Sequence, residues 1–422
     1  MRETGLWWRV GFGCSLLAMS VAGCKAPDAT SNSASNDASS GTATTSTGND
    51  TSGAAQTTSA PKVGAARPYE GKDIVLGEYS SMTGTTATYG KSTHTGVLMA
   101  VDEANQTGGV LGKQIRVQLE DDGSKPEQAA TAVTKLINSD NVLTVIGEVA
   151  SSRSLAAAPI CQAAGVPMMS PASTNPKVTQ VGDYIFRACY IDPVQGRIIA
   201  HLGSQDLKAK NAAILRDIKN AYSVGLADEI AKEFTKNGGT IVADQSFQEG
   251  DKDFRAQLTT IKSKNPQVVF VPAYYNEVAL IARQMRSLGM QQPILGGDGV
   301  ESPKLIEIGG PAVNNTMFTT HFSSESTDPL AKKFVQGYKT RYGVIPDGLT
   351  AVGYDAARLT IDAIKRAGST DRAKIRQAMA TTKDFPGVSG KITLNADRNA
   401  VKPMAVMKVE NGKYVFVKTM NE

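Results

Sequence analysis

The sequence has few of the residues that build metal centres. Only four cysteines, three histidines and two tryptophans occur among its 422 residues. His94, His201 and His321 show none of the close spacing that zinc ligands have, so we predict no metal and no cofactor. The formal charge of +5 is spread along the chain, which gives no sign of nucleic-acid binding.

One long segment lacks apolar side chains altogether. Residues 26–60 contain no Val, Ile, Leu, Met, Phe, Trp or Tyr and no Lys or Arg. Such a segment buries too little apolar surface to offset the entropy lost on ordering. We therefore expect residues 24–70 to act as a flexible linker.

The segment before this linker has the pattern of a lipoprotein export signal. Arg2 and Arg9 come before an apolar run over residues 10–22, which is too short to span a bilayer stably. At the end of this run, Val21-Ala22-Gly23-Cys24 has the form of a lipobox. We predict that residues 1–23 are a signal peptide and that Cys24 carries the lipid. The mature protein would then be exported and anchored to a bacterial cell membrane, facing the periplasm or the cell exterior.

Two cysteines remain in the folded body. Cys14 leaves with the signal and Cys24 is the lipid site, so only Cys161 and Cys189 are able to pair. Export makes a disulfide chemically possible. Cys161 lies in an apolar, helix-like segment, so simple packing without a disulfide is the other open alternative.

The remaining body alternates short β-branched runs with amphipathic segments, which is typical of parallel βαβ units. This alternation predicts an α/β fold with two doubly wound parallel-sheet lobes. We assign residues 71–192 plus about 323–398 to lobe 1, and residues 193–322 plus about 399–422 to lobe 2. The expected strands are 73–79, 115–120, 143–146, 166–170, 212–215, 240–243, 268–272 and 294–296. The expected helices include 126–139, 154–164, 222–237, 254–264, 276–288, 330–342, 349–367 and 372–380, followed by a hairpin over 406–418 that turns at Asn411-Gly412.

Polar, glycine-rich segments follow six of the expected strands. In open α/β sheets, ligands bind beyond the carboxyl ends of the strands, so a shared binding site is predicted there. A single Ser or Thr at such a position is often only a helix cap, but six together favour a site. The segments are 80–84, 147–154, 170–176, 216–222, 273–277 and 296–299.

The main rival interpretation is an enzyme, and its motifs are incomplete. Residues 84–92 (GTTATYGKS) look like a phosphate-binding loop but hold one residue too many between the first Gly and Gly-Lys-Ser. No Gly-x-Ser-x-Gly elbow of a hydrolase occurs in the sequence. We therefore predict a protein that is not an enzyme.

Several ordered motifs resemble one known family. They are SSMTGTTATYG (80–90), GGVLGKQIRV (108–117), EDDGSKPEQA (120–129), SPASTNP (170–176), YYNE (274–277) and GGDGV (296–300). On these motifs, the chain resembles the extracytoplasmic substrate-binding proteins of branched-chain amino acid ABC transporters, which are type I periplasmic binding proteins. The resemblance implies two lobes, joined by a multi-strand hinge, that close over a ligand.

The resemblance also implies a set of ligand-binding residues. Ser151 and Thr174 match groups that hold an α-carboxylate, Ala172 matches a backbone carbonyl for the ammonium, and Asp298 supplies the opposing charge. A helix N-terminus at Ser151 suits an anion on physical grounds as well. Arg153 departs from the small polar residues that relatives often keep there. The full predicted set is Tyr89, Val149, Ala150, Ser151, Ala172, Ser173, Thr174, Tyr222, Tyr274, Asp298 and Tyr354.

The expected partners follow from the same resemblance. They are an amino acid, most simply a branched-chain or other apolar one, and the permease subunits of an ABC transporter, with the receptor itself a monomer. Two alternatives stay open at this point. One is a ligand-sensing receptor domain of the same fold, and the other is a receptor for an amide or a simple carboxylate.

Overall fold

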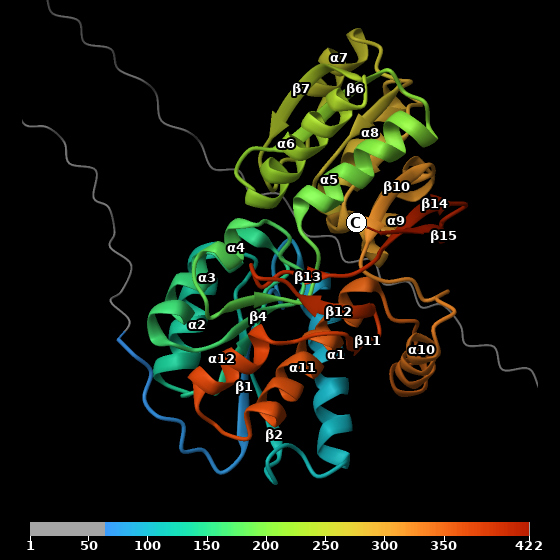
Figure 1. The fold of residues 1–422 in the computed structure, drawn as a ribbon. Coiled ribbons are helices and arrows are strands. Elements are labelled where there is room, and N and C mark those ends of the chain that lie inside the picture. The colour runs from blue at the N-terminus through green and yellow to red at the C-terminus, as the bar shows by residue number, and fades with distance from the viewer. Residues whose placement is uncertain (1–63, 422) are drawn as a thin grey trace, which may run out of the picture. The chain divides into compact units, whose positions relative to one another are not determined.

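The structure, a computed structural model, describes residues 64–421. The predicted signal peptide, the lipid site at Cys24 and most of the predicted linker lie outside the described residues. Within residues 64–421, no helix is long and apolar enough to cross a membrane. The described part of the chain forms two lobes, each built on its own sheet (Figure 1).

Lobe 1 is built on five parallel strands in the order β2-β1-β3-β4-β5. Helices cover both faces of this sheet, which is why β1 is buried along its whole length. Helices α1 and α11 pack on one face, and α2 and α3 pack on the other. The strands are β1 (Ile74–Ser80), β2 (Ile115–Asp121), β3 (Thr144–Ile146), β4 (Met168–Ser170) and β5 (Ile185–Arg187). The helices are α1 (Ala87–Gln106), α2 (Pro126–Asn138), α3 (Ser151–Ala164), α4 (Lys177–Gln180), α10 (Pro329–Tyr342), α11 (Gly348–Ala367) and α12 (Arg372–Ala380).

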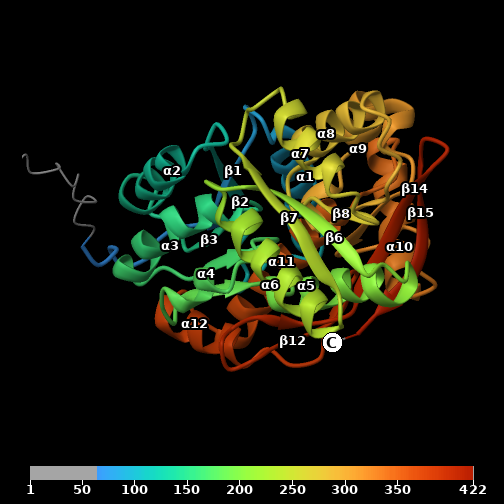
Figure 2. The ribbon, with the colours of Figure 1, turned by 90° about the horizontal axis from the view of Figure 1, so that it is seen from above.

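Lobe 2 is built on seven strands in the order β15-β14-β10-β9-β8-β6-β7. Strands β6 to β10 are parallel, and the hairpin of β14 and β15 is added antiparallel along β10. Figure 2 looks onto this lobe, with α5 and α6 on one side of its strands and α8 and α9 on the other. The strands are β6 (Asn211–Asp217), β7 (Thr240–Phe247), β8 (Val268–Phe270), β9 (Ile294–Gly296), β10 (Thr316–Thr320), β14 (Met404–Glu410) and β15 (Lys413–Met420). The helices are α5 (Asp192–His201), α6 (Ala221–Lys236), α7 (Arg255–Ser263), α8 (Tyr275–Ser287) and α9 (Pro303–Gly309).

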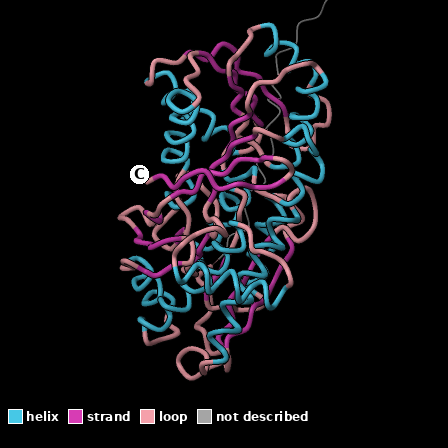
Figure 3. The backbone as a smooth tube through the Cα atoms, turned by 90° about the vertical axis from the view of Figure 1, so that its right-hand side faces the viewer, coloured by secondary structure: helices cyan, strands magenta, loops and turns pink. Residues whose placement is uncertain are grey.

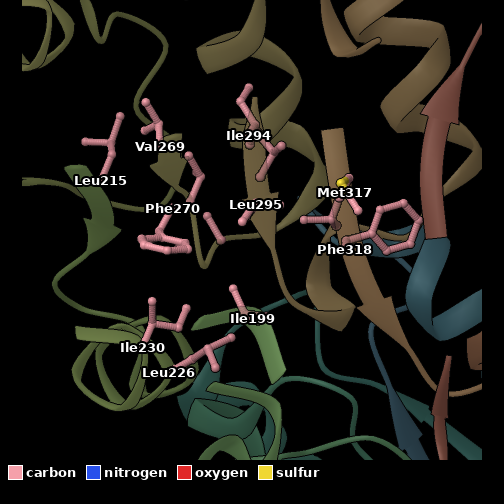
Figure 4. Close-up of a cluster of buried hydrophobic side chains, with 14 of the residues drawn as sticks. Ile199, Leu215, Leu226, Ile230, Val269, Phe270, Ile294, Leu295, Met317 and Phe318 are labelled. Carbon is pink, nitrogen blue, oxygen red and sulfur yellow. The ribbon is translucent and has the colours of Figure 1, made fainter. Parts of the chain in front are cut away.

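The core of lobe 2 shows why these segments form a layered fold. Leu226 and Ile230 lie one helical turn apart on α6, so both face the sheet. Phe270 of β8 points toward them, and all three side chains are fully buried (Figure 4). Figure 3 shows the same alternation of strands and helices along the described chain.

The chain passes between the lobes at three places. It crosses after β5 into α5, again after β10 toward α10, and finally between β13 and β14. A small antiparallel sheet lies beside these crossings (Figure 1). Its strands are β11 (Phe385–Gly387), β12 (Gly390–Leu394) and β13 (Ala400–Val401). These crossings form the hinge, and the exact lobe boundaries stay a prediction.

The two cysteines of the body are both buried and free. Cys161 packs among apolar side chains between α3 and the sheet of lobe 1, and burial raises the pKa of its thiol. Burial also raises the pKa of Cys189, to about 12. Of the two alternatives that the sequence leaves open, the structure therefore shows simple packing and no disulfide between these residues.

Candidate ligand-binding site

A small, nearly filled cavity lies between the lobes, at the carboxyl ends of the parallel strands. Both lobes contribute to its wall, and the lining side chains come from loops that directly follow strands and from the first turns of helices. The lining residues are Tyr89, Val149, Ala172, Thr174, Tyr222, Tyr274, Asp298, Gly299 and Leu349.

Three tyrosines form the aromatic part of the wall. The rings of Tyr222 and Tyr274, both in lobe 2, are stacked with centroids 5.5 Å apart. Tyr89 of α1 meets Tyr274 edge-on, with centroids also 5.5 Å apart, and its hydroxyl donates a hydrogen bond across the lobes to the Gly299 carbonyl. Burial holds the pKa of all three hydroxyls well above the ordinary value, so they are neutral hydrogen-bonding groups.

Asp298 follows β9 and is held in place from two sides. Its backbone N–H donates to Gln195 Oε1 at 2.7 Å, and Gln195 in turn accepts from the Thr319 hydroxyl at 2.6 Å. One carboxylate oxygen, Oδ2, lies 3.0 Å from His321 Nε2. Burial lowers the pKa of His321, although the neighbouring Asp298 carboxylate partly offsets this effect. His321 is therefore a neutral ring that donates a hydrogen bond from Nε2 to the Asp298 carboxyl group.

Lobe 1 supplies the opposing polar groups. Thr174 lies in the loop after β4, and Val149 lies just before the start of α3 at Ser151. A helix N-terminus leaves backbone N–H groups free and favours an anion. The Ser151 hydroxyl itself accepts from the Asn175 N–H at 3.2 Å, so it holds the two loops of lobe 1 together.

Three buried polar atoms of the lining residues have no hydrogen-bond partner among residues 64–421. They are the Thr174 hydroxyl oxygen, the Tyr274 hydroxyl oxygen and Asp298 Oδ1. Buried polar atoms are almost always paired, because leaving one unpaired costs about 1–3 kcal/mol. A hydroxyl on lobe 1 and a carboxylate oxygen on lobe 2 are thus both free to bind a molecule between the lobes.

The structure brings most of the predicted residues together. Those that line the cavity are Tyr89, Val149, Ala172, Thr174, Tyr222, Tyr274 and Asp298. Ala150, Ser151 and Ser173 are buried directly behind this wall, and the Ser173 hydroxyl donates inward to the Glu148 carbonyl at 2.8 Å. Tyr354 is the exception, because its hydroxyl donates to Glu103 at 2.6 Å on the outer side of α11. Leu349, one and a half turns earlier on α11, reaches the cavity instead.

Comparison with known proteins identifies the family of the chain. Residues 73–413 match the family model described as periplasmic binding protein. The chain belongs to the periplasmic binding protein family. A Leu/Ile/Val-binding protein of Rhizobium johnstonii, BraC3, is 32% identical over 351 residues, which cover 82% of this chain and 95% of that protein.

Two solved structures of periplasmic binding proteins are also similar. The leucine-binding protein LivK of Thermotoga maritima has a TM-score of 0.80 and 42% identity, over 82% of this chain and 99% of that one. LivJ of Streptococcus pneumoniae, solved in complex with isoleucine, has a TM-score of 0.78 and 35% identity over 82% and 99% of the two chains. The type I fold expected from the sequence motifs is confirmed.

The sequence patterns do not identify the residues that lie behind the cavity wall and position its lining groups. His321 and Gln195 fix Asp298, but His321 follows β10, a strand that the pattern did not predict. Glu148 accepts from the Ser81 hydroxyl at 2.8 Å and from the Ala150 N–H, so it positions the start of α3. Within residues 64–421, no group of three or more His, Cys, Asp or Glu side chains is placed to hold a metal ion.

Proposed function

We propose that this chain is an extracytoplasmic receptor that binds an apolar α-amino acid between its lobes and delivers it to an ABC permease. The observation that carries the proposal is the pair of unpartnered polar atoms, the Thr174 hydroxyl on lobe 1 and Asp298 Oδ1 on lobe 2. An α-amino acid needs a donor for its carboxylate and an anion for its ammonium. These two groups, with the N-terminus of α3, supply both.

The rest of the cavity wall supports an apolar side chain on the ligand. Val149, Leu349 and the tyrosine rings supply carbon surface, and no Lys or Arg is among the described residues that line the cavity. Burying three extra carbons at about 0.8 kcal/mol each favours leucine over alanine by roughly 2 kcal/mol. The names of the similar proteins, which refer to leucine, isoleucine and valine, support the same ligand class.

Calorimetric titration of the described body with a panel of amino acids tests this proposal. Leucine, isoleucine and valine are expected to bind some tens of fold more tightly than alanine. Tighter binding of glutamate, of a sugar or of a simple carboxylate than of leucine would contradict the proposed ligand class.

Asp298→Asn tests the ammonium role directly. The amide keeps the shape of the side chain and a hydrogen bond with His321 but removes the charge, and losing one partner of a buried charge pair costs about 2–5 kcal/mol. Leucine affinity is expected to fall at least about thirtyfold. Asp253→Asn is the matched control, because it removes an exposed carboxylate of lobe 2 that pairs with Arg255 and does not line the cavity. Wild-type affinity in Asp298→Asn would remove the amino-acid assignment.

The membrane anchor is the part of the proposal that rests on sequence alone. Cys24→Ser is expected to abolish lipid attachment, measured by metabolic labelling with a fatty acid. A chain that starts near Arg67 is expected to bind leucine as tightly as the full protein, because every lining residue lies beyond that point. Markedly weaker binding by the shorter chain would contradict a passive linker.

A further inference from the structure

Two buried carboxyl groups of lobe 1, here called the carboxyl pair, lie on either side of one hydroxyl. The Ser81 Oγ atom is 2.7 Å from Asp122 Oδ1 and 2.8 Å from Glu148 Oε1, and all three residues are buried. They belong to the loops that directly follow β1, β2 and β3. Three separate segments of the chain therefore meet at this hydroxyl.

The Ser81 hydroxyl has a single hydrogen, whereas the carboxyl pair presents two oxygens to it. A hydroxyl that donates to one of these oxygens turns its lone pairs toward the other. The second contact is a hydrogen bond only if that second carboxyl group carries a proton and donates it to Ser81. The geometry therefore indicates one proton for the two carboxyl groups.

The surrounding charges also suit a single negative charge on the pair. Arg153 of α3 lies nearby, with Nη1 3.8 Å from Glu148 Oε2, but it donates its hydrogen bonds elsewhere. Asp122 Oδ2 is buried without a hydrogen-bond partner among residues 64–421. One cation matches one carboxylate, so a second buried carboxylate would stay uncompensated. The other ionisable groups that face the pair or Arg153 are Tyr79, Asp121, Glu249 and Tyr274.

The pair is expected to lose its proton near neutral pH. Burial raises the pKa of Glu148 to about 7, and the nearby Asp122 carboxyl contributes to this rise while Arg153 opposes it. Burial also raises the pKa of Asp122. Because the two groups interact, they titrate as a pair. Burial holds the pKa of Tyr79 and of Tyr274 well above the ordinary value, so both tyrosines stay neutral in this range.

The carboxyl pair lies directly behind the start of α3. Glu148 Oε2 accepts from the Ala150 N–H, and the Glu148 carbonyl accepts from the Ser170 and Ser173 hydroxyls, both at 2.8 Å. The next residue, Val149, lines the cavity. The free N–H groups of this helix start favour an anion. A second negative charge on the pair therefore opposes the binding of an anion at that place.

We propose that Glu148 and Asp122 share one proton through Ser81, and that this proton keeps the start of α3 attractive to the carboxylate of the ligand. Glu148 is a positioning residue in this arrangement, because it contacts the Ala150 N–H and does not line the cavity. When the pH rises, the proton passes to the solvent, both carboxyl groups are ionised and the ligand is held less tightly. This effect on binding, unlike the shared proton itself, rests on the proposed function.

The shared proton is tested in the full chain without a ligand. Carboxyl carbons of Glu and Asp are labelled with carbon-13 and followed by NMR, and the two signals are assigned with Glu148→Gln and Asp122→Asn. Both signals are expected to change together in one step near pH 7. The absence of a common step between about pH 5 and about pH 9 would overturn the proposal.

The effect on binding is measured by calorimetric titration with leucine at about pH 6 and about pH 8. The ratio of the two affinities is expected to be at least about threefold larger in the wild type than in Glu148→Gln, because like charges inside a protein repel more strongly than in water. The amide of Glu148→Gln stays neutral at both pH values and is able to donate to Ser81. A structural role of Glu148 alone would weaken leucine binding without changing this ratio.

Glu120→Gln is the matched control, because it removes a carboxylate of β2 that pairs with Lys135 at the surface. It is expected to keep the ratio of the wild type. The titration of Asp192 and of leucine itself is common to all three proteins, so it cancels in the comparison.

Equal ratios in Glu148→Gln and the wild type would overturn the proposal, and so would an equal change of the ratio in Glu148→Gln and Glu120→Gln. If leucine binds at neither pH while the two carboxyl signals still change together, the proposed function fails and the shared proton stands.

Discussion

Nη2 of Arg153 in lobe 1 lies 3.4 Å from Oε1 of Glu249 in lobe 2. The same guanidinium donates to the Thr86 hydroxyl and to the Ser124 carbonyl, both at 2.9 Å within lobe 1. The Thr85 hydroxyl donates to Glu249 Oε1 at 2.6 Å. A single carboxylate of lobe 2 thus joins two groups of lobe 1.

Glu249→Gln is expected to weaken leucine binding without disturbing either lobe. Contacts made only when the lobes meet shift the population toward the closed arrangement, so losing one lowers affinity. Glu249 is about one-third exposed, which limits the effect to the scale of a surface pair, at most about 1 kcal/mol or fivefold. Calorimetric titration measures the affinity.

Asp253→Asn is the matched control for this variant. It removes an exposed ion pair with Arg255 that lies entirely within lobe 2. Its leucine affinity is expected to equal that of the wild type. An equal loss of affinity in both variants would show that Glu249 acts through the net charge of lobe 2 and not through Arg153.

Asp192 at the start of α5 is a buried carboxyl whose two oxygens have no hydrogen-bond partner in the described chain. Burial raises the pKa of Asp192 to about 8, against the lowering influence of the neighbouring Thr174 hydroxyl and, more weakly, of Arg187. Because the pKa of Asp192 is higher in the folded state than in the unfolded state, where it is near 4, the contribution of Asp192 to the free energy of unfolding is complete below about pH 4. It is lost as the pH rises through 8, because the folded protein must then bury a charge.

Asp192→Asn is therefore expected to stabilise the protein by at least about 1 kcal/mol more at pH 9 than at pH 5. The amide mimics the protonated carboxyl that is already present at the lower pH. Urea unfolding at both pH values measures the difference. The same gain at pH 5 and pH 9 would contradict a titrating Asp192.

Most of the fold is predictable from the sequence, because the residues that end helices and close hairpins give strong local signals. The left-handed turn at Asn411-Gly412 closes the hairpin of β14 and β15, as that residue pair favours. Gly165, also left-handed, ends α3 as expected. The start of α3 was placed three residues too late, because the polar run before Ser154 resembles a loop although it is helical from Ser151.

The site was predicted less completely, for a topological reason. The rule that ligands bind beyond strand ends finds residues only after strands that are recognised. The sequence pattern does not predict β10, which has the sequence TMFTT, so the rule does not point to His321 at the end of this strand. Tyr354 was placed at the ligand by resemblance, whereas the helical periodicity of α11 turns Leu349 to the cavity and Tyr354 to Glu103. Which face of a helix meets a cleft depends on packing that the local sequence does not encode.

Gly297 precedes Asp298 at a point where no side chain fits. A Cβ atom there would lie 2.4 Å from the Tyr222 hydroxyl oxygen and 2.6 Å from Gln195 Oε1. These two groups bind Gly299 N–H and Asp298 N–H, so they fix the backbone of the whole turn. The backbone angles of Gly297 are ordinary, which leaves close approach as the reason for glycine.

Gly297→Ala is therefore expected to push Tyr222 and Gln195 away from the turn. Overpacking of this kind costs about 1–3 kcal/mol of stability, and the displaced Asp298 is expected to bind leucine at least about tenfold more weakly. Gly337→Ala in α10 is the matched control, because its Cβ would meet only the terminal methyl of Met99, at 3.1 Å. That variant is expected to bind leucine normally and to gain up to about 1 kcal/mol of helix stability. Thermal melting and leucine titration of both variants measure these effects. Normal leucine binding by Gly297→Ala would contradict the role of Tyr222 and Gln195 in positioning Asp298.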